Sequence, residues 1–103
     1  MADFIYKDKY IWDENKNEMN KRDHFVSFEA ASEVLEDFLT IEIYDRDNSI
    51  SEDRYNVTGL YKGSALMTVS VTYTNIFTRI FSARNADSEE IGSYNAKLQK
   101  FLS

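Results

Sequence analysis

The feature that most constrains the fold is a run of three strand-like segments separated by two short turns. Residues 54–61, 65–73 and 76–83 are rich in β-branched and aromatic side chains, which favour strands. Lys62-Gly63 and Thr74-Asn75 lie between them and are typical of tight turns. Strands joined by such short turns run antiparallel, so the sequence predicts a meander.

Two further strands are predicted before this run. Leu39, Ile41 and Ile43 alternate with polar residues, which is the period of a strand. The acid-rich segment 45–53 follows and is predicted to be a loop. Near the N-terminus, Phe4–Trp12 mixes aromatic and β-branched residues with charges, so we expect one edge strand there.

Two helices are predicted between the N-terminal strand and the next one. Asp13 can cap a polar helix that runs to about His24, with Trp12 and Met19 as its only apolar anchors. This helix is therefore expected on the surface. Ser27 can cap a second helix, whose apolar stripe consists of Phe28, Ala31, Leu35 and Phe38.

The C-terminal segment is predicted to be a helix that packs on the sheet. Asp87 is followed three positions later by Glu90, which resembles a capping box. Its apolar stripe consists of Ile91, Tyr94, Leu98 and Phe101. The predicted fold class is therefore α+β, an antiparallel meander with two N-terminal helices and one C-terminal helix.

Composition limits the domain organisation and the location. A chain of 103 residues with fifteen aromatic side chains fits a single domain, 1–103. No apolar segment is long enough to span a membrane and no signal sequence is present, so we expect a cytoplasmic location without membrane contact. The net charge of −6 favours solubility or a basic partner and counts against a large phosphate-binding surface.

The residue types leave few kinds of site open. The chain has no cysteine, a single histidine, His24, and no glycine-rich phosphate loop, so we expect neither a metal site nor a cofactor. Lys16 and Asn20 lie on the same helical face as His24. Arg79 shares a strand face with Phe77 and Phe81. The Arg79 side chain either packs its aliphatic part on these rings with its charge in solvent, or binds a phosphate group. The sequence leaves both interpretations open.

Four groups of residues, in this order along the chain, carry a resemblance to a known family. They are Trp12-Asp13 with Lys16, Asn20 and His24; Val26-Ser27-Phe28-Glu29 with Ala31; Arg54-Tyr55 with Gly59; and Phe81-Ser82-Ala83-Arg84-Asn85-Ala86 with Glu90 and Tyr94. Together they resemble the BrnT family, the toxins of the BrnT/BrnA toxin–antitoxin systems. The resemblance extends over about residues 10–94.

The resemblance implies a RelE-like fold and a metal-independent ribonuclease that stops translation. It also implies a hetero-oligomer with a BrnA-like antitoxin, which has a ribbon-helix-helix DNA-binding part. His24 would then act as acid or base, Arg79 and Arg84 would hold the phosphate, and Lys16 and Arg54 would bind substrate. All three catalytic candidates should then lie close together.

A regular strand would point Arg79 and Arg84 to opposite faces, because their positions differ by an odd number. Both can serve one site only if the strand ends early or contains a bulge before Arg84.

Two positions depart from the family pattern. Asp23 stands where the family usually carries a basic residue, and Phe25 stands where it carries glycine. A carboxylate beside His24 repels RNA phosphate, so Asp23 is predicted to weaken cleavage. Three functions remain open: an active ribonuclease toxin, a catalytically weak member that serves mainly as a protein-binding module in a repressor complex, and an unrelated α+β interaction domain.

Overall fold

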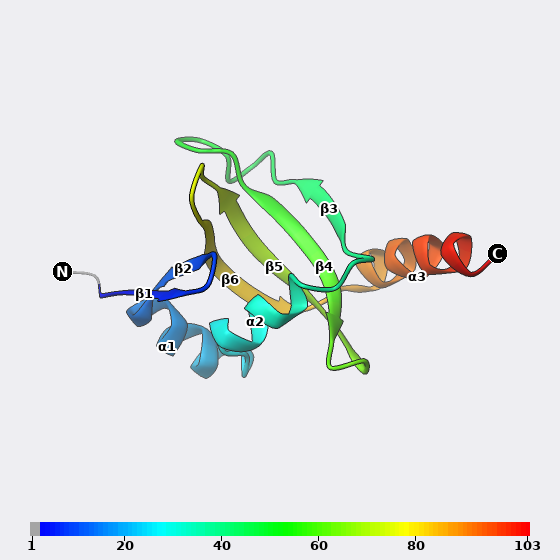
Figure 1. Cartoon of the computed structure of the whole chain (residues 1–103), viewed down its shortest axis with the longest axis horizontal. Helices are drawn as coiled ribbons and strands as arrows, with labels where there is room; N and C mark the ends of the chain where they lie inside the picture. Colours follow the sequence, from blue (N-terminus) through cyan, green and yellow to red (C-terminus); the bar gives the residue numbers. More distant parts are fainter. Residues whose placement is uncertain (1–2) are drawn as a thin grey trace.

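A computed structural model describes residues 3–103 as three helices around a six-stranded sheet (Figure 1). The strands are β1 (Phe4–Lys7), β2 (Tyr10–Asp13), β3 (Ile41–Tyr44), β4 (Tyr55–Tyr61), β5 (Ala65–Tyr73) and β6 (Thr78–Asn85). The helices are α1 (Glu14–His24), α2 (Phe28–Val34) and α3 (Ser88–Leu102). The strand order is β1-β2-β6-β5-β4-β3. No helix within the described residues is long and apolar enough to cross a membrane.

The predicted meander is confirmed, but the expectation of a wholly antiparallel sheet is wrong. Strands β3 to β6 are joined in sequence order and pair antiparallel. The predicted single strand Phe4–Trp12 is instead a hairpin, in which the chain reverses at Asp8 with φ 55°. Its second strand, β2, pairs parallel with β6, from Tyr10 opposite Thr78 to Trp12 opposite Ile80. The sheet is therefore mixed.

The hydrophobic core lies between α2 and one face of the sheet, which we call the inner face. The inner face carries Val57, Val69, Val71, Ile80 and Ala83, and α2 contributes Phe28, Ala31 and Val34. Helix α2 approaches β4 closely, since a Cβ atom at Gly59 would lie 2.8 Å from the Val34 carbonyl oxygen. Only glycine fits at this crossing. We call the opposite face of the sheet the outer face.

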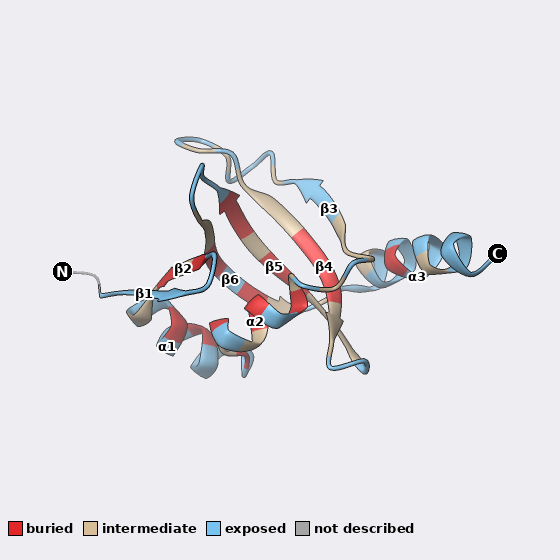
Figure 2. Ribbon diagram, viewed as in Figure 1, coloured by how far each residue is buried: buried red, intermediate tan, exposed pale blue. Residues whose placement is uncertain are grey.

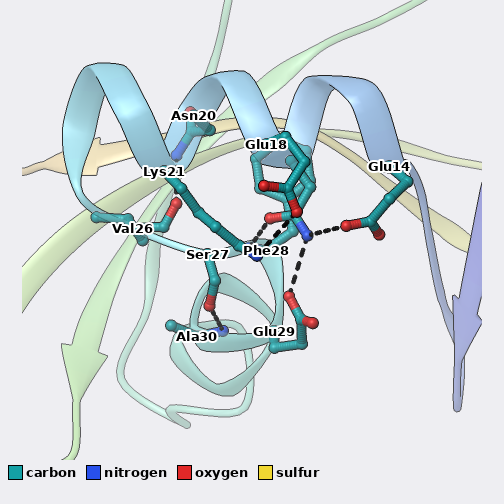
Figure 3. A network of polar contacts seen from close by, with 10 residues as sticks. Glu14, Glu18, Asn20, Lys21, Val26, Ser27, Phe28, Glu29 and Ala30 are labelled. Atoms are coloured by element: carbon teal, nitrogen blue, oxygen red, sulfur yellow. Dashed lines mark hydrogen bonds and ion pairs between the residues drawn. The ribbon is translucent and has the colours of Figure 1, made fainter.

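Helix α1 has the predicted cap and length, and of its two predicted anchors Trp12 is fully buried but Met19 is not. Asp13 caps the helix by accepting a hydrogen bond from the Asn15 backbone N–H. Met19 is 51% exposed, whereas Asn17 is fully buried. Asn17 accepts a hydrogen bond from the Phe28 backbone N–H and fixes the start of α2 against α1, a region that Figure 3 shows in detail. A polar residue, not an apolar stripe, therefore holds α1.

Helix α2 begins at its predicted cap but ends earlier than its predicted stripe. Ser27 accepts from the Ala30 backbone N–H, and the helix ends at Val34. Phe38 lies beyond the end of the helix and is 76% exposed, so its place in the stripe was wrong. It packs edge-on against Phe101 at 5.4 Å between ring centroids.

Helix α3 starts with the predicted capping box between Asp87 and Glu90. The prediction that its stripe packs on the sheet was wrong, because only Tyr94 is buried. The helix extends beyond the sheet and is exposed along most of its length (Figure 2). Two contacts join it to the segment after α2: the Tyr94 hydroxyl donates to Asp37, and the Lys97 ammonium group donates to the Thr40 carbonyl oxygen. A third joins it to β6, where Arg84 donates to Glu90.

Candidate functional site

A bulge in β6 brings the two predicted arginines onto one face of the sheet. Val71 pairs with Ile80 and Ser70 pairs with Ser82, so Phe81 is the additional residue. Before the bulge Arg79 alternates with the core residue Ile80, and after it Arg84 alternates with the core residue Ala83. Both arginines therefore lie on the outer face, as the sequence required for a shared site.

Three cationic side chains surround the ring of Phe81 on this face. The Arg54 guanidinium carbon lies 3.9 Å from the ring centroid, and that of Arg79 lies 4.9 Å away. The Lys16 ammonium nitrogen approaches the same ring to 5.4 Å. These distances are in the range of cation–π contacts. We call Lys16, Arg54, Arg79 and Phe81 the cation cluster.

The cation cluster has unused capacity to bind an anion. The Nε atoms of Arg54 and Arg79 are buried and find no hydrogen-bond acceptor among residues 3–103. Within the same residues no carboxylate oxygen lies within 4 Å of the charged nitrogens of Lys16 or Arg79, and Arg54 has only Glu52, at 3.6 Å. Buried donors without acceptors are costly, and the unpaired charges of Lys16 and Arg79 can bind an anion.

His24 lies beside this cluster, at the end of α1. It lines a surface hollow of about 320 Å³, hollow A, together with Lys16 and Arg54. The other residues that line hollow A are Met19, Asn20, Asp23, Phe81 and Ser82. Helix α1 contacts β2 and β6, and its C-terminal residues Asp23 and His24 line hollow A together with Ser82 of the outer face. An imidazole ring and two cationic side chains therefore share one hollow.

The turn after His24 holds a phenylalanine in a left-handed backbone conformation. Phe25 adopts the left-handed conformation with φ 61°, and its N–H closes the helix by donating to the Lys21 carbonyl oxygen. The Phe25 side chain is 91% exposed. A non-glycine residue in this conformation stores local strain, and His24 beside it lines hollow A.

Arg84 lies in an adjoining hollow. Hollow B, of about 370 Å³, is lined by Asp45, Asn48, Arg54, Asn56, Ser70, Ser82 and Arg84. Arg54 and Ser82 line both hollows. The Arg84 guanidinium donates two hydrogen bonds to Glu90, of 2.7 and 3.0 Å, and Glu90 raises the pKa of Arg84. Unlike Lys16 and Arg79, Arg84 is therefore already paired with a carboxylate.

The structure brings together most of the predicted site residues. His24, Lys16 and Arg54 line one hollow, Arg79 joins them through the Phe81 ring, and Arg84 lies next to them in hollow B. Asn20 supports the fold: it is buried, and its side-chain amide hydrogen-bonds to the backbone N–H and C=O of Ala83. Sequence reasoning missed Phe81 as the centre of the cluster and Ser82 as part of both hollows.

A family model matches the chain over residues 12–90, and its description is "Ribonuclease toxin, BrnT, of type II toxin-antitoxin system". The chain belongs to the BrnT family. The matched region contains all the residues of the cation cluster and of both hollows. No curated protein sequence matches the chain.

A solved structure supports the BrnT fold. The crystal structure of the Brucella abortus ribonuclease toxin BrnT matches with a TM-score of 0.54 and 20% sequence identity. The match covers 75% of this chain and 94% of the Brucella chain. In this BrnT family member most residues of the shared motifs build the scaffold: Trp12, Phe28 and Ala31 are in the core, while Asp13 and Ser27 cap helices.

Proposed function

We propose that this protein is the toxin of a type II toxin–antitoxin system, an endoribonuclease that cleaves RNA and inhibits translation in the bacterial cytoplasm. The observation that carries this proposal is the cation cluster, with its buried unpaired Nε atoms beside His24. Family membership supports the same activity. A RelE-like relationship of the fold is proposed on the sequence resemblance.

The proposed chemistry is attack of a ribose 2′-hydroxyl on the adjacent phosphorus. The P–O5′ bond breaks, which leaves a 2′,3′-cyclic phosphate and a 5′-hydroxyl, and the reaction uses no metal ion or cofactor. His24 takes the proton from the nucleophile or gives one to the leaving oxygen, since an imidazole ring can both accept and donate a proton. Arg79 and Arg54 stabilise the charge that develops on the phosphorane, and Lys16 orients the phosphate. Arg84, in hollow B, binds the neighbouring nucleotide.

Cleavage of a labelled RNA by the purified protein tests this assignment. His24→Gln and Arg54→Gln should each lower the rate by about 100-fold or more, as expected when a proton-transfer group or a charge stabiliser is removed. Arg46→Gln is the matched control, because Arg46 is exposed and lines neither hollow. Equal rates for wild type, His24→Gln and Arg54→Gln would refute the assignment.

Asp23 is proposed to make this protein a weaker ribonuclease than its relatives. It lines hollow A with His24, so its carboxylate lies on the side where RNA phosphate would bind. Asp23→Lys should raise cleavage about tenfold at low salt, because it removes a repulsion and adds an attraction worth about 1–2 kcal/mol. His24→Ala in the same chain should abolish that gain.

Glu18→Lys is the matched control for Asp23→Lys. It changes the net charge equally, on the same helix, but Glu18 does not line hollow A. The gain should shrink as salt rises, because phosphate contacts are screened. The same gain from Glu18→Lys would mean that the rate of cleavage depends on the net charge of the protein and not on the position of Asp23. No gain at low salt, with a wild type that already cleaves well, would place Asp23 away from the RNA path.

A BrnA-like antitoxin is the proposed partner, in a hetero-oligomer that neutralises the toxin. The family description supports an antitoxin, and the net charge of −6 favours a basic one. Induced expression with and without the neighbouring gene, followed by growth and RNA integrity, tests this. A catalytically weak member that mainly binds a protein partner is the second candidate, favoured by Asp23 in hollow A. Complex formation without any RNA cleavage would support it.

A further inference from the structure

Hollow B has a floor of polar side chains on three adjacent strands. Asn56 on β4 pairs with Ser70 on β5, and Ser70 pairs with Ser82 on β6. All three side chains lie on the outer face and line the hollow. Because they stand on paired strands, an amide and two hydroxyl groups are held in a fixed row. Such a row suits a planar ligand with several hydrogen-bonding groups.

The wall of hollow B contains a carboxylate that is oriented by its own loop. Asp45 accepts hydrogen bonds from the Asn48 side-chain amide at 2.9 Å and from the Asn48 backbone N–H at 3.4 Å. A carboxylate has about four acceptor positions, so Asp45 retains capacity for a ligand. Arg54 and Arg84 supply N–H donors on the same lining. Hollow B therefore offers one strong acceptor and two strong donors.

The charge of hollow B distinguishes it from the cation cluster. Its lining includes the Asp45 carboxylate, and Arg84 is paired with Glu90. A phosphate group would meet repulsion from Asp45, whereas the cation cluster next to it has unpaired buried donors. Hollow B consequently suits a neutral polar group. In RNA the neutral polar groups near a phosphate are the ribose and the nucleobase, and of these the nucleobase is the planar one that suits a row of polar side chains.

We propose that hollow B binds the base of the nucleotide next to the cleaved phosphate, with a preference for guanine. The inference rests on the proposed function, since it names the substrate of the same site. Guanine has N–H donors at N1 and N2 that match a carboxylate, and acceptors at O6 and N7 that match arginine. Adenine lacks the O6 acceptor, and uracil lacks an amino donor. Asp45 is thus assigned as the residue that selects the base.

Binding of nucleotides to the intact protein tests the proposal without requiring cleavage. Titration with 5′-GMP, 5′-AMP, 5′-CMP and 5′-UMP is followed by backbone amide shifts of the isotope-labelled protein. GMP should bind at least about fivefold more tightly than the other three, and it should shift the amides of Asn56, Ser70 and Ser82. Asp45→Asn should weaken GMP binding about tenfold, because the loss of a bidentate base contact has that size.

Asp47→Asn is the matched control, since Asp47 is exposed on the same loop and does not line hollow B. It should leave the preference for GMP unchanged. Guanosine, which has no phosphate, should shift the same amides as GMP, whereas inorganic phosphate should shift amides around hollow A only. Equal affinity for the four nucleotides, or loss of preference in Asp47→Asn but not in Asp45→Asn, would overturn the proposal.

Cleavage of an RNA that contains every dinucleotide separates this proposal from the proposed function. Wild type should cut next to guanine, and Asp45→Asn should cut more evenly. An absence of cleavage together with selective GMP binding would refute the ribonuclease but leave the base site standing. Cleavage without base preference, together with equal nucleotide binding, would refute the base site alone.

Discussion

Replacing Asn20 by alanine should destabilise the whole domain, because this side chain takes the place of a strand. Strand β2 pairs with β6 only as far as Ile80. Beyond that point the Asn20 amide binds β6, donating to the Ala83 carbonyl oxygen at 2.8 Å and accepting from the Ala83 N–H at 3.1 Å. Its Nδ2 also donates to the Val26 carbonyl oxygen at 2.8 Å.

The magnitude follows from those three contacts. Asn20 is 6% exposed, so alanine would leave one backbone N–H and two carbonyl groups without their partner in a buried place. Each such loss costs about 1–3 kcal/mol, and water entering the space would recover part of it. We expect the free energy of unfolding to fall by about 3 kcal/mol. For a domain of this size, that lowers Tm by about 12–24 °C.

Urea denaturation followed by circular dichroism measures this change in the free energy of unfolding. Asn15→Ala is the control, since Asn15 is an exposed asparagine on the same helix, and it should change stability by less than about 0.5 kcal/mol. A loss below about 1 kcal/mol for Asn20→Ala would mean that the Ala83 backbone finds other partners, and that α1 is held by Asn17 alone.

Three further changes test local features. Phe25→Gly should raise the free energy of unfolding, measured by urea denaturation, by about 0.5–1 kcal/mol. Glycine adopts φ 61° without strain, and little buried surface is lost because the Phe25 side chain is exposed. A loss of stability would refute this. Burial alone raises the pKa of Glu90, but the hydrogen bonds that Glu90 accepts from Arg84, the Asp87 backbone N–H and Thr68 have the larger combined effect and lower its pKa. The Glu90–Arg84 pair therefore stabilises the fold above about pH 4.3, and this contribution is lost as the pH falls through the lower pKa of Glu90 in the folded protein. Glu90→Gln should lower the free energy of unfolding by about 0.5–1 kcal/mol at pH 7 and leave it unchanged near pH 2. Urea denaturation at both pH values measures this difference. Tyr94→Phe removes the hydroxyl that donates to Asp37 and should cost about 1 kcal/mol; an unchanged Tm would mean that α3 is held by its other contacts.

Features that depend on neighbouring residues in the sequence were predicted correctly. The caps at Asp13, Ser27 and Asp87 are confirmed because each binds an N–H only two or three positions away. The turn at Lys62-Gly63 and the antiparallel meander are confirmed for the same reason. Short connections leave a chain few alternatives, so local signals are sufficient there.

The candidate site was predictable in its residue types but not in its arrangement. The resemblance named His24, Arg54, Arg79 and Lys16, and these lie together on the outer face or in hollow A. The sequence indicated that two distant arginines need a bulge to share a face. It did not indicate that Phe81 is the bulged residue, because this depends on how β6 is paired with β5.

The sequence by itself determined the helices, most of the strands and the turns, because each of these is specified by hydrogen bonds and side-chain periods within a few residues. Only the tertiary structure decided the parallel pairing of β2 with β6, the replacement of a strand partner by Asn20, and the projection of α3 beyond the sheet. An apolar stripe indicates that one face of a helix will be buried, but it does not indicate which surface of the protein that face will pack against. In α3 that surface is mostly the segment after α2, where Tyr94 reaches Asp37, and the sheet itself receives little of the stripe.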